Sequence, residues 1–314
     1  VHGMPQVVGV GLACLDVLIR LREMPSWEHG GRISAFSFDG GGPVGTALVA
    51  VQKLGVSAGY VGTVGTDRVA KLKLGFLTDY GVDVSRVAVR EGPETQVVIV
   101  YVDEDTGERT FAGVFHEGGP VSLLPEELDR DYILSADYLH LDGMNYEAGM
   151  QAARWMKEAG KTVVYDGHKT SADSVPESVR AAVELVDVLI CGEGFGHALT
   201  GKSDLYEAGE AALDLGPRIV VQTQGAGGSY TVTRDERFHV PAFSVPVVDT
   251  TGAGDVFHGA YIVGLVHGWD LRQVARFATA VSAIKCTGLG GRAPIPSYEQ
   301  VLGFLSERGV PIEE

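Results

Sequence analysis

Short apolar segments recur along the chain, and polar or glycine-rich residues follow them at the same end. These segments span residues 7–13, 138–141, 162–165, 188–190 and 218–222. Their length and composition are typical of buried strands in a parallel sheet. Because helical stretches separate the later segments, the pattern predicts a doubly wound α/β fold that binds its ligands at the carboxyl edge of the sheet.

The size and charge of the chain narrow the possible classes of function. Its 314 residues fit one large α/β domain spanning 1–314. The net charge of −16 argues against nucleic acid as a partner. No apolar run reaches the roughly 18 residues of a membrane span. Three widely spaced cysteines and the lack of a signal-peptide pattern lead us to expect a cytoplasmic protein.

Two pairs of segments with alternating polarity interrupt the α/β pattern. Residues 17–21 and 32–38 form the first pair, and residues 95–102 and 108–113 form the second. Such segments are typical of half-exposed antiparallel strands. We expect a small β-sheet lid, formed by about 17–40 and 95–115, that excludes water from the reaction. An edge extension of the main sheet is the alternative.

The stretch 249–255, Asp-Thr-Thr-Gly-Ala-Gly-Asp, is the strongest candidate for the chemistry. We expect a buried strand over 243–248 before it and a helix over 256–266 after it. The glycines allow several backbone N–H groups to point at one spot, and the helix start adds partial positive charge. Asp255 stands at the edge of this anion hole. Phosphoryl transfer to an alcohol needs such donors together with a base for the hydroxyl.

Other candidate residues follow strands or lie in glycine-rich turns. Asp16 follows the first apolar segment at the expected binding edge, although a turn residue or helix cap would look the same. The run 40–46, Gly-Gly-Gly-Pro-Val-Gly-Thr, allows close approach to a ligand or forms a hinge, and it lacks P-loop spacing. The turn 223–228 either holds phosphates through its N–H groups or is a plain tight turn.

Taken together, these segments resemble the ribokinase-like, PfkB-type family of carbohydrate kinases over nearly the whole chain. The stretch 249–260 looks like the C-terminal signature of the family, and Gly41-Gly42 with the helix ending at 53–55 looks like its N-terminal signature. The resemblance implies a doubly wound body with a β-sheet lid that often serves dimerisation. It also implies ATP-dependent phosphorylation of a sugar hydroxyl with Mg²⁺.

The resemblance also implies roles for individual residues. Asp255 would take the hydroxyl proton, and the N–H groups of Gly252, Ala253 and Gly254 would form the anion hole. The positions matching sugar contacts are Asp16, Gly41, Gly42, Thr46 and Asp142. Those matching nucleotide contacts are Thr223, Gly225, Gly228, Thr279 and Ser282. Asp249 and Thr251, with the turn 286–291, match a site that holds a potassium-like ion in some members.

Some positions depart from the family pattern. Thr46 replaces an Asn that usually touches the sugar. The Asn-x-x-Glu motif tied to Mg²⁺ falls on Gly192 and Phe195, so only Glu193 remains to act on Mg²⁺ through water. These departures look like the subgroup that contains the sulfofructose kinases. Met144, however, stands where that subgroup has an arginine for its anionic substrate, so we expect a neutral sugar.

The sequence therefore predicts an ATP-dependent sugar kinase that acts on ribose or on a hexose such as fructose. A nucleoside kinase shares the signature, and it would use aromatic lid residues such as Phe36, Phe38, Phe111 and Phe115 to contact a base. These aromatic residues are more often lid core. The missing Asn-x-x-Glu pair motivates a third hypothesis, a sugar- or nucleotide-binding regulator with weak catalysis. We expect a homodimer formed through the lid.

Overall fold

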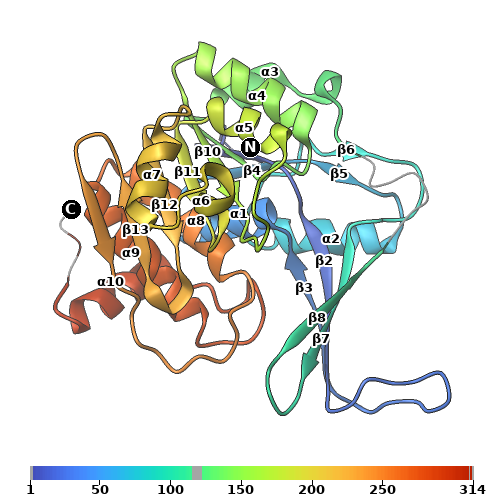
Figure 1. Ribbon diagram of the computed structural model, residues 1–314. Coiled ribbons are helices and arrows are strands. Elements are labelled where there is room, and N and C mark those ends of the chain that lie inside the picture. Colours follow the sequence, from blue (N-terminus) through green and yellow to red (C-terminus); the bar gives the residue numbers. More distant parts are fainter. Residues whose placement is uncertain (1–2, 115–121, 311, 313–314) are drawn as a thin grey trace.

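An eight-stranded, mostly parallel sheet forms the centre of the molecule (Figure 1). The computed structural model describes residues 3–114, 122–310 and 312. In sheet order the strands are β14 (Arg237–Val240), β13 (Ser229–Val232), β12 (Ile219–Thr223), β11 (Val188–Cys191), β10 (Thr162–Gly167), β9 (Tyr138–Leu141), β1 (Val7–Val10) and β4 (Ala58–Val61). Only the β13–β14 end of this sheet is antiparallel. The predicted doubly wound α/β fold is confirmed.

Helices cover both faces of this sheet and create two hydrophobic cores. One face carries α1 (Pro43–Lys53), α8 (Ala253–Val266), α9 (Leu271–Lys285) and α10 (Tyr298–Glu307). The other carries α3 (Arg130–Ser135), α4 (Tyr146–Glu158), α5 (Glu177–Glu184), α6 (Phe195–Thr200) and α7 (Leu205–Leu213). Successive strand residues face opposite cores, as Val7 and Val8 do. Burial on both faces explains why these strands are apolar throughout.

A separate four-stranded sheet projects from the body, as predicted for the lid (Figure 1). Its strands, in order, are β3 (Ile33–Gly41), β2 (Cys14–Leu21), β7 (Val97–Asp103) and β8 (Arg109–Gly113). Strands β2 and β3 pair antiparallel, as do β7 and β8, while β2 and β7 run parallel. The strand pairing contradicts the alternative of an edge extension. Residue 115, which we included in the lid, lies outside the described residues.

The remaining elements connect the lid to the body. They are the helix α2 (Arg68–Thr78), the short pair β5 (Thr63–Val64) and β6 (Ala88–Val89), and the 3₁₀ turn η1 (Pro125–Glu127). A second 3₁₀ turn, η2 (Gly225–Gly227), lies within the body and joins β12 to β13. No helix in the described ranges combines the length and hydrophobicity needed to cross a membrane.

The predicted buried strand at 243–248 is wrong. This segment is an irregular loop, and the side chains of Val247 and Val248 are 63% and 61% exposed. Pro241 and Pro246 have no N–H group, so this stretch cannot donate a regular ladder of hydrogen bonds. The apolar residues form the wall of a cavity described below, which explains their pattern without a strand.

Candidate active site

The anion-hole stretch lies at the start of α8, as predicted. Gly252 precedes the helix with φ of 69°, a left-handed conformation that glycine adopts without steric cost. A side chain at Gly254 would enter open space, so this turn of backbone faces solvent or a ligand. The first N–H groups of a helix have no acceptor within the helix and are available to an anion. The Ala253 N–H, by contrast, donates to the Thr250 carbonyl oxygen at 3.2 Å.

Asp255 lies in the first turn of α8 and is half-buried. Burial raises the pKa of this carboxyl group, the charged His168 opposes the rise, and the negative charge of Asp142 adds to it. The net effect is a pKa above the ordinary aspartate range. A carboxylate with a raised pKa is a stronger base for a hydroxyl proton.

A buried aspartate and a histidine at the end of β10 adjoin this carboxylate. His168 Nδ1 lies 3.5 Å from Asp166 Oδ1, and His168 Nε2 lies 2.9 Å from the Asp142 main-chain oxygen. Burial lowers the pKa of His168, but the negative charges of Asp166, Asp142 and Asp255 and the hydrogen bond to the Asp142 main-chain oxygen together outweigh it, so this pKa is raised. We assigned no role to either residue from the sequence, although their position after a strand pointed to the binding edge.

The predicted sugar cradle brings Asp16 against the glycine run. A Cβ atom added at Gly41 would lie 2.3 Å from Asp16 Oδ2, so only glycine fits there. Gly42 has φ of 86°, which also favours glycine. Burial raises the pKa of Asp16 to about 6. The predicted location of Asp16 was wrong in one respect, because this residue lies within lid strand β2 and not at the end of β1.

Two of the predicted sugar contacts are occupied by the protein itself. Asp142 accepts hydrogen bonds from the backbone N–H groups of Leu12 at 2.8 Å and Met144 at 2.9 Å. The Thr46 hydroxyl is buried and accepts from Arg292 Nε at 3.3 Å. Both side chains therefore hold the surrounding loops together in this structure, and their contact with sugar stays a prediction.

Arg292 is a fully buried residue to which the sequence gave no role. Its Nη2 donates to the Gly41 carbonyl oxygen at 2.5 Å, and its Nη1 donates to the Phe76 carbonyl oxygen at 3.2 Å. Its backbone N–H donates to Asp39 Oδ2 at 3.2 Å. The guanidinium thus fixes the glycine run of the cradle to the turn that follows α9.

A cavity of about 500 Å³ lies between the turn 223–228 and helices α8 and α9. It is lined by every predicted nucleotide residue except Glu193, namely Thr223, Gly225, Gly228, Thr279 and Ser282. Val245 and Val247 of the 243–248 loop form an apolar wall. Ala253 also lines the cavity, so the cavity adjoins the anion hole. Size, apolar walls and a few polar groups are typical of a small-ligand site. Nucleotide binding by these residues stays a prediction.

Packing around Gly192 and Phe195 explains why this segment lacks the Asn-x-x-Glu motif. A side chain at Gly192 would lie 2.8 Å from the Lys169 backbone nitrogen, so no Asn fits there. The Phe195 side chain is buried in the core below the sheet. Glu193 remains exposed and forms an ion pair with Lys169 Nζ at 2.5 Å.

Asp249 and Thr251, the predicted ligands of a monovalent cation, lie side by side. The Thr251 hydroxyl donates to Asp249 Oδ1 at 2.7 Å. Burial opposes ionisation of Asp249, but hydrogen bonds from Thr251 and Gly290 outweigh it and lower the pKa of this carboxyl group. The carboxylate also binds Arg109 from the lid at 2.5 Å. The expected cation ligands are therefore already paired with a positive side chain.

Residues 4–298 match the model of the family described as pfkB family carbohydrate kinase. The chain belongs to this family. Like other members, it is an ATP-dependent carbohydrate kinase with the ribokinase-like fold. The finer resemblance to the sulfofructose-kinase subgroup stays a prediction.

Several pfkB relatives match most of the chain. An ATP-dependent ribose-1-phosphate kinase of Halopiger xanaduensis is 32% identical, over 97% of this chain and 99% of its own length. An aminoimidazole riboside kinase of Salmonella typhimurium is 30% identical, over 86% and 89% respectively. Among solved structures, Arabidopsis thaliana ribokinase complexed with ribose and ATP superimposes with a TM-score of 0.82 at 24% identity, over 96% and 99% of the two chains.

Proposed function

We propose that this protein transfers the γ-phosphoryl group of ATP to a hydroxyl of ribose, or of a hexose such as fructose, with Asp255 as the general base. One observation carries the proposal. Asp255 lies at the anion hole, and the cavity lined by Thr223 and Ser282 adjoins this hole because Ala253 also lines the cavity. The cradle of Asp16 and Gly41 offers a buried carboxylate for a sugar hydroxyl.

Residues of the chain have two roles in the proposed reaction: they stabilise the charge on the phosphoryl group and they accept the hydroxyl proton. N–H groups at the start of α8, those of Gly252 and Gly254 among them, stabilise the charge that develops on the transferred phosphoryl oxygens. Asp255 accepts the proton of the attacking hydroxyl. The 500 Å³ cavity holds the nucleotide so that its phosphates reach the anion hole.

Mg²⁺ would neutralise charge on the nucleotide phosphates. No group of three or more potential metal-ligating side chains occurs among residues 3–114, 122–310 and 312. This absence of a protein cage fits an ion that keeps several waters and binds substrate phosphates. We assign Glu193 as the carboxylate that contacts its water shell. Lys169 forms an ion pair with Glu193 and therefore lies next to this proposed contact.

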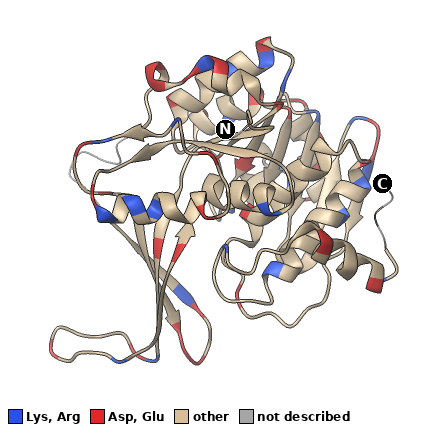
Figure 2. Cartoon of the chain, turned by 180° about the vertical axis from the view of Figure 1, so that it is seen from behind, with Lys and Arg blue, Asp and Glu red and all other residues tan. Residues whose placement is uncertain are grey.

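We further propose that the protein forms a homodimer through its lid. Phe36 and Phe38, on the edge strand β3 of the lid sheet, are 55% and 44% exposed, and their ring centroids lie 5.1 Å apart. Large exposed aromatic groups on one small sheet are typical of a protein interface. Figure 2 shows segments with Lys or Arg and segments with Asp or Glu scattered over the same view of the body. This mixture supports our expectation that nucleic acid is not a partner.

A panel of acceptors tests the proposed function. ADP release from ATP is measured with ribose, fructose, ribose 1-phosphate, adenosine and inosine, each at equal concentration. We expect kcat/KM for ribose or fructose to exceed that for either nucleoside by about 10-fold or more, since a site built for one set of hydroxyls rejects a poorly fitting acceptor. Ribose 1-phosphate is included because a relative at 32% identity carries that name.

The other outcomes of this panel have clear meanings. A preference for adenosine or inosine would contradict the sugar-kinase hypothesis and support the nucleoside-kinase hypothesis. Binding of ATP and sugar by calorimetry, without ADP release on any acceptor, would contradict catalysis and support the regulator hypothesis.

A further inference from the structure

We propose that Arg109 fastens the lid to the loop that leads into the anion hole, and that its guanidinium replaces a monovalent cation there. Phosphoryl transfer then needs no potassium-like ion. Arg109 acts as a positioning residue, because its contacts are with the loop and not with the reacting atoms. This inference rests on the proposed function, since it concerns the same anion hole.

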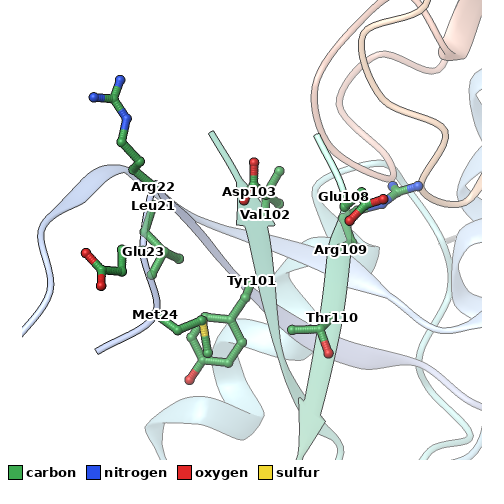
Figure 3. A pocket seen from close by; sticks show the side chains of 10 residues that line it. All are labelled: Leu21, Arg22, Glu23, Met24, Tyr101, Val102, Asp103, Glu108, Arg109 and Thr110. Carbon is green, nitrogen blue, oxygen red and sulfur yellow. The ribbon is translucent and has the colours of Figure 1, made fainter. Parts of the chain in front are cut away.

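Arg109 begins β8 and reaches from the lid to three consecutive residues of the body. Its Nη1 donates to Asp249 Oδ1 at 2.5 Å and also to Thr251 Oγ1, and its Nη2 donates to Thr250 Oγ1 at 2.7 Å. Figure 3 shows this side chain extending from its strand toward the neighbouring loop. One planar guanidinium therefore holds the whole segment that precedes Gly252.

The oxygen atoms of Asp249, together with the main-chain oxygen of Cys286, have donors from the chain at the expected cation site. Asp249 Oδ2 accepts from the Gly290 N–H at 2.9 Å. The Asp249 main-chain oxygen accepts from Lys285 Nζ at 2.9 Å. The Cys286 main-chain oxygen accepts from the N–H groups of Val248 at 2.8 Å and Asp249 at 3.2 Å. These residues do not fit a cation site, because a hard cation needs oxygen ligands that it can coordinate directly.

The local charge also disfavours a cation. Arg109 binds the carboxylate of Asp249, and Lys285 binds the main-chain oxygen of the same residue, so two positive groups already lie at this residue. An added cation would repel both groups and would have to displace one from its oxygen partner. The side chains of Arg109 and Asp249 are 23% and 7% exposed, so water screens this repulsion only in part.

The contact links lid position to the geometry of the anion hole. The Thr250 carbonyl oxygen accepts from the Ala253 N–H at 3.2 Å, so restraint of Thr250 is passed to the first turn of α8. Arg109 can make its bonds only while β8 lies against this loop. Lid closure and ordering of the phosphoryl site are therefore one event, as in enzymes whose lids complete the catalytic site.

Steady-state kinetics in different salts test this inference. ADP release is measured in potassium, sodium and tetramethylammonium chloride at one ionic strength, for the wild type and for Arg109→Ala. We expect wild-type kcat to agree within about twofold in all three salts, because only general screening acts on it. We expect Arg109→Ala to lose roughly 10-fold or more in kcat through disorder of the anion hole, and to regain part of it with potassium or guanidinium ions.

A lid variant outside this contact provides the control. Arg22→Ala removes a side chain that is 72% exposed and whose ion pair within the described ranges is with Asp105 at 3.5 Å, so kcat should not change. Activation of the wild-type enzyme by potassium of several-fold would overturn the inference. An Arg109→Ala variant whose kcat equals that of the wild type would also overturn it. Absence of kinase activity in the wild type would instead contradict the proposed function.

Hydrogen exchange gives a readout that does not depend on turnover. Amide exchange over 249–255 should be faster in Arg109→Ala than in the wild type or in Arg22→Ala, because the loop loses its bridge to the lid. Arg109→Gln, which keeps part of the stem and removes the charge, replaces the alanine variant if thermal unfolding shows that the latter does not fold. Equal exchange in a folded Arg109 variant and the wild type would overturn the inference.

Discussion

At the scale of single residues, the proposed catalysis depends on a carboxylate whose surroundings raise its proton affinity. Asp255 combines a half-buried position with the nearby negative charge of Asp142, and both raise its pKa. His168 carries a pKa that is itself raised, so it is positively charged over more of the acidic range and opposes this rise. Asp142 and His168 therefore shift, in opposite directions, the pH range in which Asp255 is ionised.

The pH profile of kcat/KM follows from this arrangement. Activity should fall as the pH is lowered through the pKa of Asp255, with a midpoint above the value of about 3.9 for an ordinary aspartate. In His168→Gln, the loss of the positive charge raises the pKa of Asp255 further, so the acidic limb should move to higher pH. ADP release measured from pH 4 to pH 9, in steps of about one pH unit or finer, checks both expectations.

A distant histidine controls for general effects of substitution. His197→Gln changes an exposed residue near the end of α6, and its acidic limb should coincide with that of the wild type. A limb that stays in place or moves to lower pH in His168→Gln would contradict the coupling of His168 to the catalytic base.

Single residues also show how far sequence reasoning can reach. The stretch 249–255 could be identified because its glycines and aspartates are neighbours in the chain. Arg109 could not, because its partner Asp249 lies 140 residues away and nothing in the lid sequence marks the contact. Arg292 follows two glycines, yet its contact with Gly41 spans 251 residues and depends on the complete fold.

At the scale of elements, α8 places the proposed catalytic residues by packing closely on α1. A Cβ atom at Gly259 would lie 2.3 Å from the Ala47 carbonyl oxygen and 2.9 Å from Ala50 Cβ. The helix is buried over most of its circumference, which accounts for its nearly uniform apolar sequence. Asp255 lies one turn before Gly259, so the helix–helix distance also sets the position of the base.

Gly259→Ala should separate the two helices and destabilise the protein. We expect a loss of about 1–3 kcal/mol in the free energy of unfolding, because the contacting oxygen belongs to the backbone and cannot move aside. Gly303→Ala in α10 is the matched control, since a Cβ there meets nothing within 4 Å. That variant should be slightly more stable, owing to the higher helix propensity of alanine. Urea unfolding measures both, and equal stability of the two variants would contradict the role of close packing.

The elements show where apolar patterning misleads. Residues 243–248 have the composition of a buried strand, but two prolines and a cavity wall explain them better. The helices and the strands of the parallel sheet could be predicted, because their patterns report burial in a core. Burial against a ligand cavity produces the same apolar pattern without the backbone geometry of a strand.

At the scale of the whole molecule, the sheet and the lid bring three parts of the site together. The glycine run after β3, the turn after β12 and the start of α8 come from distant segments of the chain. Only the turn after β12 could be placed by the rule that the carboxyl ends of parallel strands meet at one edge, because β3 belongs to the lid sheet and α8 follows an irregular loop. The attachment of the lid through Arg109 could not, because it depends on how two sheets are oriented.

The central claim is that Asp255, at the meeting point of these parts, is the base for phosphoryl transfer. Turnover of Asp255→Asn with the preferred sugar tests it most directly, with Asp105→Asn in the exposed lid hairpin as the control. We predict that kcat of Asp255→Asn falls by roughly 10²–10⁴-fold, while ATP binding measured by calorimetry and the control variant stay near wild type. Near-normal turnover of Asp255→Asn would contradict the account.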